Sequence, residues 1–220
     1  MAEAHVHVES VVRQGTSEEG ERFLLYTDAG EVACLFLGPA ESAAAVLWAG
    51  AWGGEGRISP IARSVAQELL QDGIASLLVR YRQPWELPAC VRDTQAGIAF
   101  LGTMGIERIA LVGHSFSGAV VISAAPMSEA VVAVVALASQ TYGARNVDRI
   151  APRPLLLVHG TADTRLDTYC SEQIYSWAKK PKELVLLEGA SHSLWERRDA
   201  LLPLLRQWLR SKLLGSGAGS

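Results

Sequence analysis

The most informative stretch of the chain reads Ile109-Ala-Leu-Val-Gly-His-Ser-Phe-Ser-Gly118. It begins as an apolar run typical of a strand, breaks at Gly113, and leads into a second apolar run, Ala119–Ala125. A strand, a tight turn and a helix with a serine at the apex are typical of a nucleophile elbow. The turn strains the backbone of Ser115, so small residues must stand two positions before and after it. Gly113 meets this need; Ser117 replaces the usual glycine and is small enough to fit.

The elbow also predicts half of an oxyanion hole. The N–H of Phe116 lies in the first turn of the helix, where the helix dipole favours negative charge. The second N–H is expected in the glycine-rich loop 49–54, which follows the apolar strand 43–48. Ala51 is the best candidate for this donor. A flexible surface loop is the alternative, and Trp52 argues against it.

A serine nucleophile needs a base and an orienting carboxylate, in the chain order Ser, Asp, His for this kind of elbow. The apolar strand Pro154–His159 runs into a loop with Asp163, and the strand Glu183–Leu187 runs into a loop with His192. Both loops follow the C-terminal ends of strands, where open α/β sheets build their sites. An N-cap role is the alternative for Asp163, and Asp167 is the second candidate for the acid.

Of the five histidines, only His192 lies late in the chain, in the loop after the last predicted strand. His5 and His7 belong to a polar N-terminal segment. His114 is the variable residue of the elbow, and His159 ends a strand, where hydrogen bonding to nearby backbone is the simpler interpretation. A loop histidine by itself is often incidental. Here it completes a set of three.

These motifs, Gly113–Gly118, His159–Asp163 and Gly189–His192, resemble the α/β-hydrolase superfamily. More narrowly, they are similar to small bacterial hydrolases of the dienelactone-hydrolase or carboxylesterase type. The resemblance runs from about Glu31 to Leu209. Dienelactone hydrolases usually carry a cysteine nucleophile, whereas this elbow carries Ser115. The resemblance therefore implies a serine esterase and argues against dienelactone as the substrate.

The alternation of strand-like and helical segments predicts the α/β-hydrolase fold: a mostly parallel central sheet with helices on both faces. The predicted strands are Val32–Leu37, Ala44–Trp48, Ile74–Tyr81, Ile109–Val112, Val131–Leu137, Pro154–His159 and Glu183–Leu187. The predicted helices are Ile58–Gln71, Pro88–Gly102, Ser117–Ala125, Leu166–Lys179 and Leu194–Leu214.

A single domain is expected over residues 1–214, followed by a flexible tail over 215–220. Within residues 1–30, the segments His5–Arg13 and Arg22–Tyr26 predict an antiparallel hairpin at the edge of the sheet.

No lid domain is expected, because only Gln140–Arg153 separates the predicted strand 131–137 from the next one. The site should therefore be open, with a substrate-binding wall built from Trp48, Trp52 and Tyr142, next to Phe116. Ordinary packing is the alternative for these aromatic side chains.

Charge and hydropathy exclude several kinds of partner. Twenty Lys and Arg against 23 Asp and Glu give a net charge of −3 without a basic stripe, so no nucleic-acid partner is expected. The longest apolar region, Ala119–Ala138, is interrupted by Pro126 and by Ser128-Glu129, so no membrane span is expected. The N-terminus lacks the pattern of a signal peptide.

Three cysteines, Cys34, Cys90 and Cys170, are odd in number and lack the spacing of a metal site. A reducing, cytoplasmic location is the simplest interpretation. No metal and no cofactor are expected.

Together these features predict a serine hydrolase that cleaves small carboxylic esters or thioesters through an acyl-enzyme intermediate, with a small-molecule ester as its partner. Ser115, Asp163 and His192 are the predicted catalytic residues, and the N–H groups of Phe116 and Ala51 the predicted oxyanion hole. One alternative is a non-catalytic binding protein on the same scaffold, since a fold does not fix function. The other is a peptidase or perhydrolase that uses the same triad.

Overall fold

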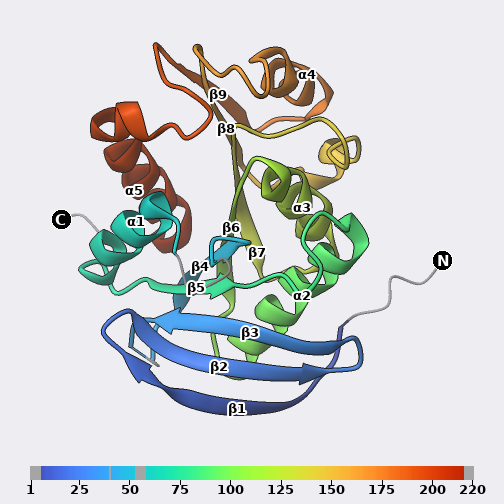
Figure 1. The fold of residues 1–220 in the computed structure, drawn as a ribbon, viewed down its shortest axis with the longest axis vertical. Coiled ribbons are helices and arrows are strands. Elements are labelled where there is room, and N and C mark those ends of the chain that lie inside the picture. The colour runs from blue at the N-terminus through green and yellow to red at the C-terminus, as the bar shows by residue number, and fades with distance from the viewer. Residues whose placement is uncertain (1–5, 40, 53–57, 216–220) are drawn as a thin grey trace.

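A computed structural model describes residues 6–39, 41–52 and 58–215 of the chain. Within these ranges, nine strands form one sheet in the order β1-β2-β3-β5-β4-β6-β7-β8-β9 (Figure 1). The strands are β1 (Val8–Ser17), β2 (Gly20–Thr27), β3 (Gly30–Leu37), β4 (Ala44–Ala49), β5 (Ala75–Val79), β6 (Arg108–His114), β7 (Val131–Leu137), β8 (Leu155–Gly160) and β9 (Lys182–Leu187).

The sheet is mostly parallel, which confirms the predicted fold class. Strands β5, β4, β6, β7, β8 and β9 pair in parallel, whereas β1, β2, β3 and β5 pair antiparallel. Strands β4, β5 and β8 are buried along their whole length. Continuous apolar runs suit such strands because helices cover both of their faces. The antiparallel hairpin of β1 and β2 forms one edge of the sheet.

Five α-helices pack on the sheet in the described part of the chain (Figure 1). They are α1 (Pro60–Leu70), α2 (Leu87–Thr103), α3 (Phe116–Ala124), α4 (Tyr169–Trp177) and α5 (Arg198–Leu214). Helices α1 and α5 cover one face, and α2 and α3 cover the other. Short 3₁₀ turns occur at Ala125–Met127, Val147–Ile150 and Trp195–Arg197.

The two faces of the sheet carry separate apolar cores, because successive side chains of a strand point to opposite sides. In β4, Val46 and Trp48 pack with α1 and α5, whereas Leu47 and Ala49 pack with α2 and α3. The last turn of α5 is tied to the sheet by Arg108 of β6. Its guanidinium donates to the carbonyls of Leu213 and Lys212, each at 2.8 Å.

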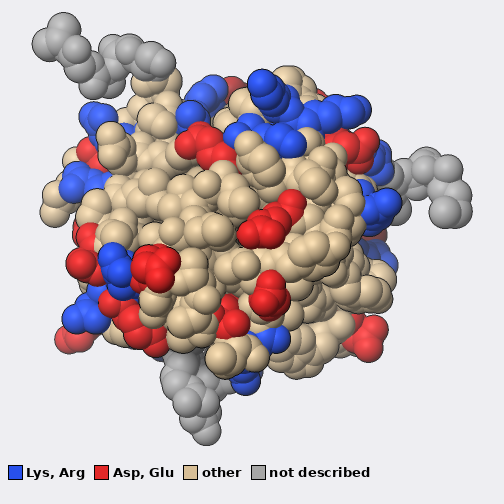
Figure 2. All heavy atoms as spheres, turned by 90° about the horizontal axis from the view of Figure 1, so that it is seen from above, with Lys and Arg blue, Asp and Glu red and all other residues tan. Residues whose placement is uncertain are grey.

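Parts of three predictions lie outside the described residues: Met1–His5 of the edge hairpin, Gly53 and Gly54 of the loop after β4, and the tail beyond Gly215. None of the described helices has the length and apolar character needed to span a bilayer. The absence of a lid domain stays a prediction. On the face drawn in Figure 2, most of the surface is uncharged, basic side chains lie mainly toward the rim, and acidic side chains lie both at the rim and near the centre.

Candidate active site

Ser115 sits at a strained turn between β6 and α3. Its backbone has φ 58° and ψ −120°, and a positive φ is uncommon for any residue other than glycine. Gly113 makes this turn possible, because a Cβ at that position would lie 2.1 Å from the carbonyl oxygen of Ser117. The local geometry is that of the elbow that the sequence predicts. It holds the Ser115 hydroxyl at the C-terminal end of the parallel sheet.

The structure brings the three predicted catalytic side chains into one hydrogen-bonded chain. Nε2 of His192 lies 2.9 Å from Oγ of Ser115, and Nδ1 of His192 lies 2.7 Å from Oδ2 of Asp163. The serine follows β6, the aspartate follows β8 and the histidine follows β9. Hydrogen bonds of this length allow a proton to pass from the hydroxyl to the ring while the carboxylate fixes the tautomer.

The Asp163 carboxylate is fully buried and has donors at both oxygens. Its Oδ1 accepts the N–H groups of Arg165 at 2.8 Å and Leu166 at 3.0 Å. Burial raises the pKa of Asp163, but the N–H of Leu166, the His192 ring and the N–H of Arg165 outweigh burial, so the net pKa lies below its ordinary value. Asp163 therefore stays ionised. The second candidate, Asp167, is exposed and accepts the N–H of Tyr169 at the start of α4 instead.

The loop that carries His192 is held on two sides. On one side, Nε2 of His114 lies 2.7 Å from the carbonyl oxygen of His192, with the two rings 4.9 Å apart. On the other side, the Glu196 carboxylate accepts the Ser191 hydroxyl at 2.8 Å and the Ser193 hydroxyl at 3.2 Å. The pKa of Glu196 is lowered by its own N–H and by the Ser191 hydroxyl. Sequence reasoning did not identify Glu196 or the contact of His114.

Of the two predicted oxyanion-hole donors, Phe116 directly follows Ser115, and Ala51 lies in the loop after β4. Among the described residues, the N–H groups of Phe116 and Ala51 have no hydrogen-bond acceptor. The loop after β4 approaches the elbow closely at Gly50, where φ is +65° and an added Cβ would lie 2.6 Å from the Ser117 hydroxyl and from the Tyr81 ring. Only glycine fits there. Its N–H donates to the carbonyl of Val79 at 3.1 Å, which fixes the loop against β5.

A cavity of about 560 Å³ opens onto Ser115 and His192. Its walls combine aromatic rings with arginine side chains. Besides Ser115 and His192, the lining residues include Trp52, Tyr81, Trp85, Phe116, Arg80, Arg82 and Arg165. The size suits a small organic substrate.

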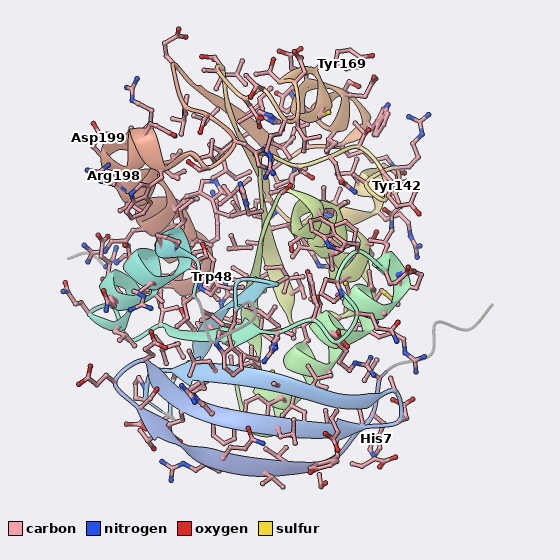
Figure 3. All side chains as sticks on the ribbon, in the orientation of Figure 1. His7, Trp48, Tyr142, Tyr169, Arg198 and Asp199 are labelled. Atoms are coloured by element: carbon pink, nitrogen blue, oxygen red, sulfur yellow. The ribbon has the colours of Figure 1, made fainter. Side chains whose placement is uncertain are left out.

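Two of the predicted wall residues do not line this cavity. Trp48 is buried among α1 and α5, because it shares the face of β4 with Val46, and its Nε1 donates to the Ser76 hydroxyl at 3.3 Å. Tyr142 is 71% exposed on the connection between β7 and β8 (Figure 3). The prediction for these two residues is therefore wrong. Trp52 and Phe116 do line the cavity.

Tyr81 and Trp85 line the cavity, the role that the sequence analysis expects of Trp48 and Tyr142. The Trp85 side chain is 74% exposed and packs on Phe116 with the ring centroids 5.4 Å apart. Its backbone has φ 76°, a strained value for a bulky residue. The Tyr81 hydroxyl is buried without a hydrogen-bond partner among the described residues, and burial raises its pKa. The hydroxyl therefore stays protonated. Both residues follow β5, and this position after the end of a strand is the feature of the sequence that could have identified them as cavity residues.

The segment with Tyr81 and Trp85 is anchored by a buried ion pair. Nε of Arg82 lies 2.5 Å from Oδ1 of Asp93 in α2, and the backbone N–H of Arg82 donates to Oδ2 at 2.9 Å. The Asp93 side chain is fully buried. The guanidinium also donates to the carbonyl of Ala29. This pair fixes the direction in which the chain leaves β5.

Within residues 6–39, 41–52 and 58–215, no three His, Cys, Asp or Glu side chains form a group that could hold a metal ion.

Comparison with solved structures places the chain in one fold class. Dienelactone hydrolase from Anabaena variabilis is similar over 96% of this chain and 100% of its own, with TM-score 0.73 and 21% identity. Est1E from Butyrivibrio proteoclasticus is similar over 88% and 99%, with TM-score 0.72 and 15% identity. An esterase domain of a Rhodothermus marinus protein gives TM-score 0.69 at 19% identity, over 93% and 99%. The chain has the α/β-hydrolase fold.

Sequence comparison covers a much smaller part of the chain than structural comparison does. No family model matches the chain. The "Uncharacterized protein YfhR" of Escherichia coli is 40% identical over 57 residues, which make up 26% of this chain and 20% of that protein. The match thus spans about a fifth of the length of this relative.

Proposed function

We propose that the protein is a serine hydrolase that cleaves small carboxylic esters or thioesters through an acyl-enzyme intermediate. The observation that carries the proposal is the unbroken chain from Ser115 Oγ through His192 to Asp163, with distances of 2.9 and 2.7 Å. It starts at a serine held in a strained elbow. The similarity in fold to a dienelactone hydrolase and to an esterase domain supports this proposal.

In the first step, Oγ of Ser115 attacks the carbonyl carbon of the substrate while Nε2 of His192 takes the hydroxyl proton. The new bond from Oγ to carbon leaves the carbonyl oxygen as an oxyanion. The N–H groups of Phe116 and Ala51 are the proposed donors to it. Asp163 stays ionised and stabilises the imidazolium that forms.

In the next steps, His192 returns its proton to the leaving alcohol or thiol as the bond from carbon to that group breaks. Water then enters, gives a proton to His192 and attacks the acyl carbon. The bond to Oγ breaks, Ser115 recovers the proton, and the carboxylic acid leaves. No other reactant is needed.

The direct test is labelling with a fluorophosphonate probe, combined with rate measurements. Ser115→Ala should abolish labelling and lower kcat by about 10³-fold or more, because the triad acts as a unit. Ser117→Ala is the matched control, two residues away, and should keep the label. Asp163→Asn should lower kcat by several orders of magnitude through the wrong tautomer of His192, whereas Asp167→Asn should cost little.

A panel of p-nitrophenyl esters, thioesters and aminoacyl amides separates the proposal from its alternatives. Turnover of esters or thioesters above amides supports it. A preference for amides would instead indicate a peptidase, and peroxide-dependent peracid formation a perhydrolase. A protein that is neither labelled nor active on the panel would be a binding protein on this scaffold, and labelling that persists in Ser115→Ala would move the nucleophile to Ser117.

A further inference from the structure

One carboxylate binds the residues on both sides of His192. The loop of this histidine runs from the end of β9 to the 3₁₀ turn at Trp195–Arg197, which contains Glu196. The hydroxyl of Ser191 donates to Oε1 of Glu196 at 2.8 Å, and the backbone N–H of Ser191 donates to Oε2 at 3.4 Å. The hydroxyl of Ser193 lies 3.3 Å from Oε1 and 3.2 Å from Oε2. The residue before His192 and the residue after it are thus held by the same side chain.

These bonds limit the rotation of the backbone at His192. The backbone of a residue turns only about its own φ and ψ, and such a turn moves the preceding residue relative to the following one. Because Ser191 and Ser193 bind one carboxylate, their relative movement is restricted. The direction of the His192 side chain is restricted with it, and so is the approach of its Nε2 to Oγ of Ser115 at 2.9 Å.

The same loop carries a strained residue next to these bonds. Leu194 has φ 60° and ψ −2°, in the left-handed region that is uncommon for residues other than glycine. Its side chain is fully buried in the core that α1 and α5 share with the sheet. Strain of this kind persists only where the surrounding contacts hold it. Loss of the Glu196 bonds would therefore let the backbone near His192 relax.

We propose that Glu196 is a positioning residue for His192, and that it acts through the hydroxyls of Ser191 and Ser193. Glu196 is not among the described residues that line the substrate cavity, so its effect on catalysis passes through the histidine. Its own N–H and the Ser191 hydroxyl hold the pKa of Glu196 below its ordinary value, so the carboxylate stays ionised. This inference rests on the proposed hydrolase function.

The test starts from three single variants. Glu196→Ala removes every bond of the carboxylate. Glu196→Gln keeps an oxygen in the place of Oε1, which can accept both hydroxyls. Glu188→Ala is the matched control, because it removes an exposed acidic side chain from the same loop. The Glu188 side chain makes no hydrogen bond or ion pair with the described residues, and its carbonyl, which accepts from Arg197, is unchanged by the substitution.

Glu196→Ala should lower kcat for p-nitrophenyl acetate about tenfold with KM unchanged, because a small displacement of the base slows the reaction without touching the substrate. Glu196→Gln should stay within about threefold of the wild type, because a neutral oxygen still accepts, though more weakly. Glu188→Ala should leave kcat unchanged. A wild-type kcat in Glu196→Ala, or an equal loss in Glu188→Ala, would overturn the positioning role.

A double-mutant cycle tests whether the effect passes through the two hydroxyls. The variant Ser191→Ala/Ser193→Ala should itself lower kcat, and the addition of Glu196→Ala should lower it little further. Losses that multiply would show that Glu196 acts on His192 by another route, which would refute the proposal.

A second measurement does not depend on catalysis. The backbone amides of residues 193–195 donate within the loop, to Ser191 and to the hydroxyl of Ser193. Their hydrogen exchange should be faster in Glu196→Ala than in the wild type and unchanged in Glu188→Ala. A wild-type protein that hydrolyses nothing would refute the proposed function but leave this readout intact. Unchanged exchange in Glu196→Ala, or faster exchange with a wild-type kcat, would contradict the proposal.

Discussion

The His114 ring lies between the elbow and the loop of His192. Its Nε2 donates to the carbonyl of His192, so the side chain next to Ser115 also holds the loop of His192 in place. Burial lowers the pKa of His114, although the bond to the His192 carbonyl opposes this effect. The ring therefore stays neutral to a lower pH than an exposed histidine.

This lowered pKa predicts a specific loss of stability in acid. A histidine in the unfolded chain takes up a proton at about pH 6.5. Below that value the unfolded chain binds more protons than the folded one at position 114, so the free energy of unfolding falls as pH falls. His114→Gln removes this titration and can keep a donor to the His192 carbonyl. Between about pH 7.5 and about pH 5, its melting temperature should fall less than that of the wild type. An equal fall in melting temperature for His114→Gln and the wild type would show that His114 contributes nothing to the loss of stability in acid.

Among the elements, the connection from β5 to α2 is fixed by a single buried ion pair. Arg82 and Asp93 join the end of the strand to the first turns of the helix, and the cavity residues Tyr81 and Trp85 lie beside or within this short span. Stability and the shape of the cavity are thus coupled at this point.

Breaking this pair from one side should be costly, because it leaves a charge buried without its partner. Asp93→Asn should lower the free energy of unfolding by about 3 kcal/mol, measured by urea denaturation, and should also lower kcat/KM. The matched control is Arg92→Gln, next to it in α2, which removes the exposed pair with Asp28 at 3.6 Å. This change should cost about 0.5 kcal/mol or less. A similar cost for both variants would contradict the anchoring role of Asp93.

The same elements show what the sequence could predict. The parallel strands were identified because their apolar runs are continuous, and the order of serine, aspartate and histidine at successive strand ends identified the triad candidates. The predicted strand Ile74–Tyr81 extends past the true end of β5 at Val79, because the apolar ring of Tyr81 continues the pattern. The chain turns there because of the Arg82–Asp93 pair, whose members are 11 residues apart in sequence.

The prediction of Trp48 as a residue of the cavity wall was wrong for a related reason. Trp48 was assigned to the cavity by its position at a strand end, yet strand alternation places it with Val46 in the opposite core. The contact of His114 could not be predicted, because its partner in the loop of His192 is 78 residues away in the sequence. The bonds of Glu196 to Ser191 and Ser193 are local, but no periodic pattern of the sequence marks them.

At the scale of the whole molecule, the cavity leads to a prediction about the size of the substrate. Each methylene contributes about 0.8 kcal/mol only while there is apolar wall to bury it. Trp52, Tyr81, Trp85 and Phe116 provide wall around Ser115 for a few carbons. We expect kcat/KM for p-nitrophenyl esters to peak at about two to six acyl carbons and to fall beyond that. A continued rise to long chains, or a jump in rate at the micelle concentration, would indicate a cover over the site.

The position of α5 has a consequence for how the chain folds during synthesis. This helix follows every described strand in the chain, yet with α1 it covers the face of the central strands that carries Val46 and Trp48. A nascent chain that has already formed β4, β6 and β7 therefore exposes the part of this face that α1 does not cover until α5 leaves the ribosome. Chaperones would meet this face first. Arg108 of β6 is synthesised about a hundred residues before Leu213 and Lys212, whose carbonyls it binds in the last turn of α5. The central strand β6 therefore gains these hydrogen bonds only when the end of the helix has been synthesised.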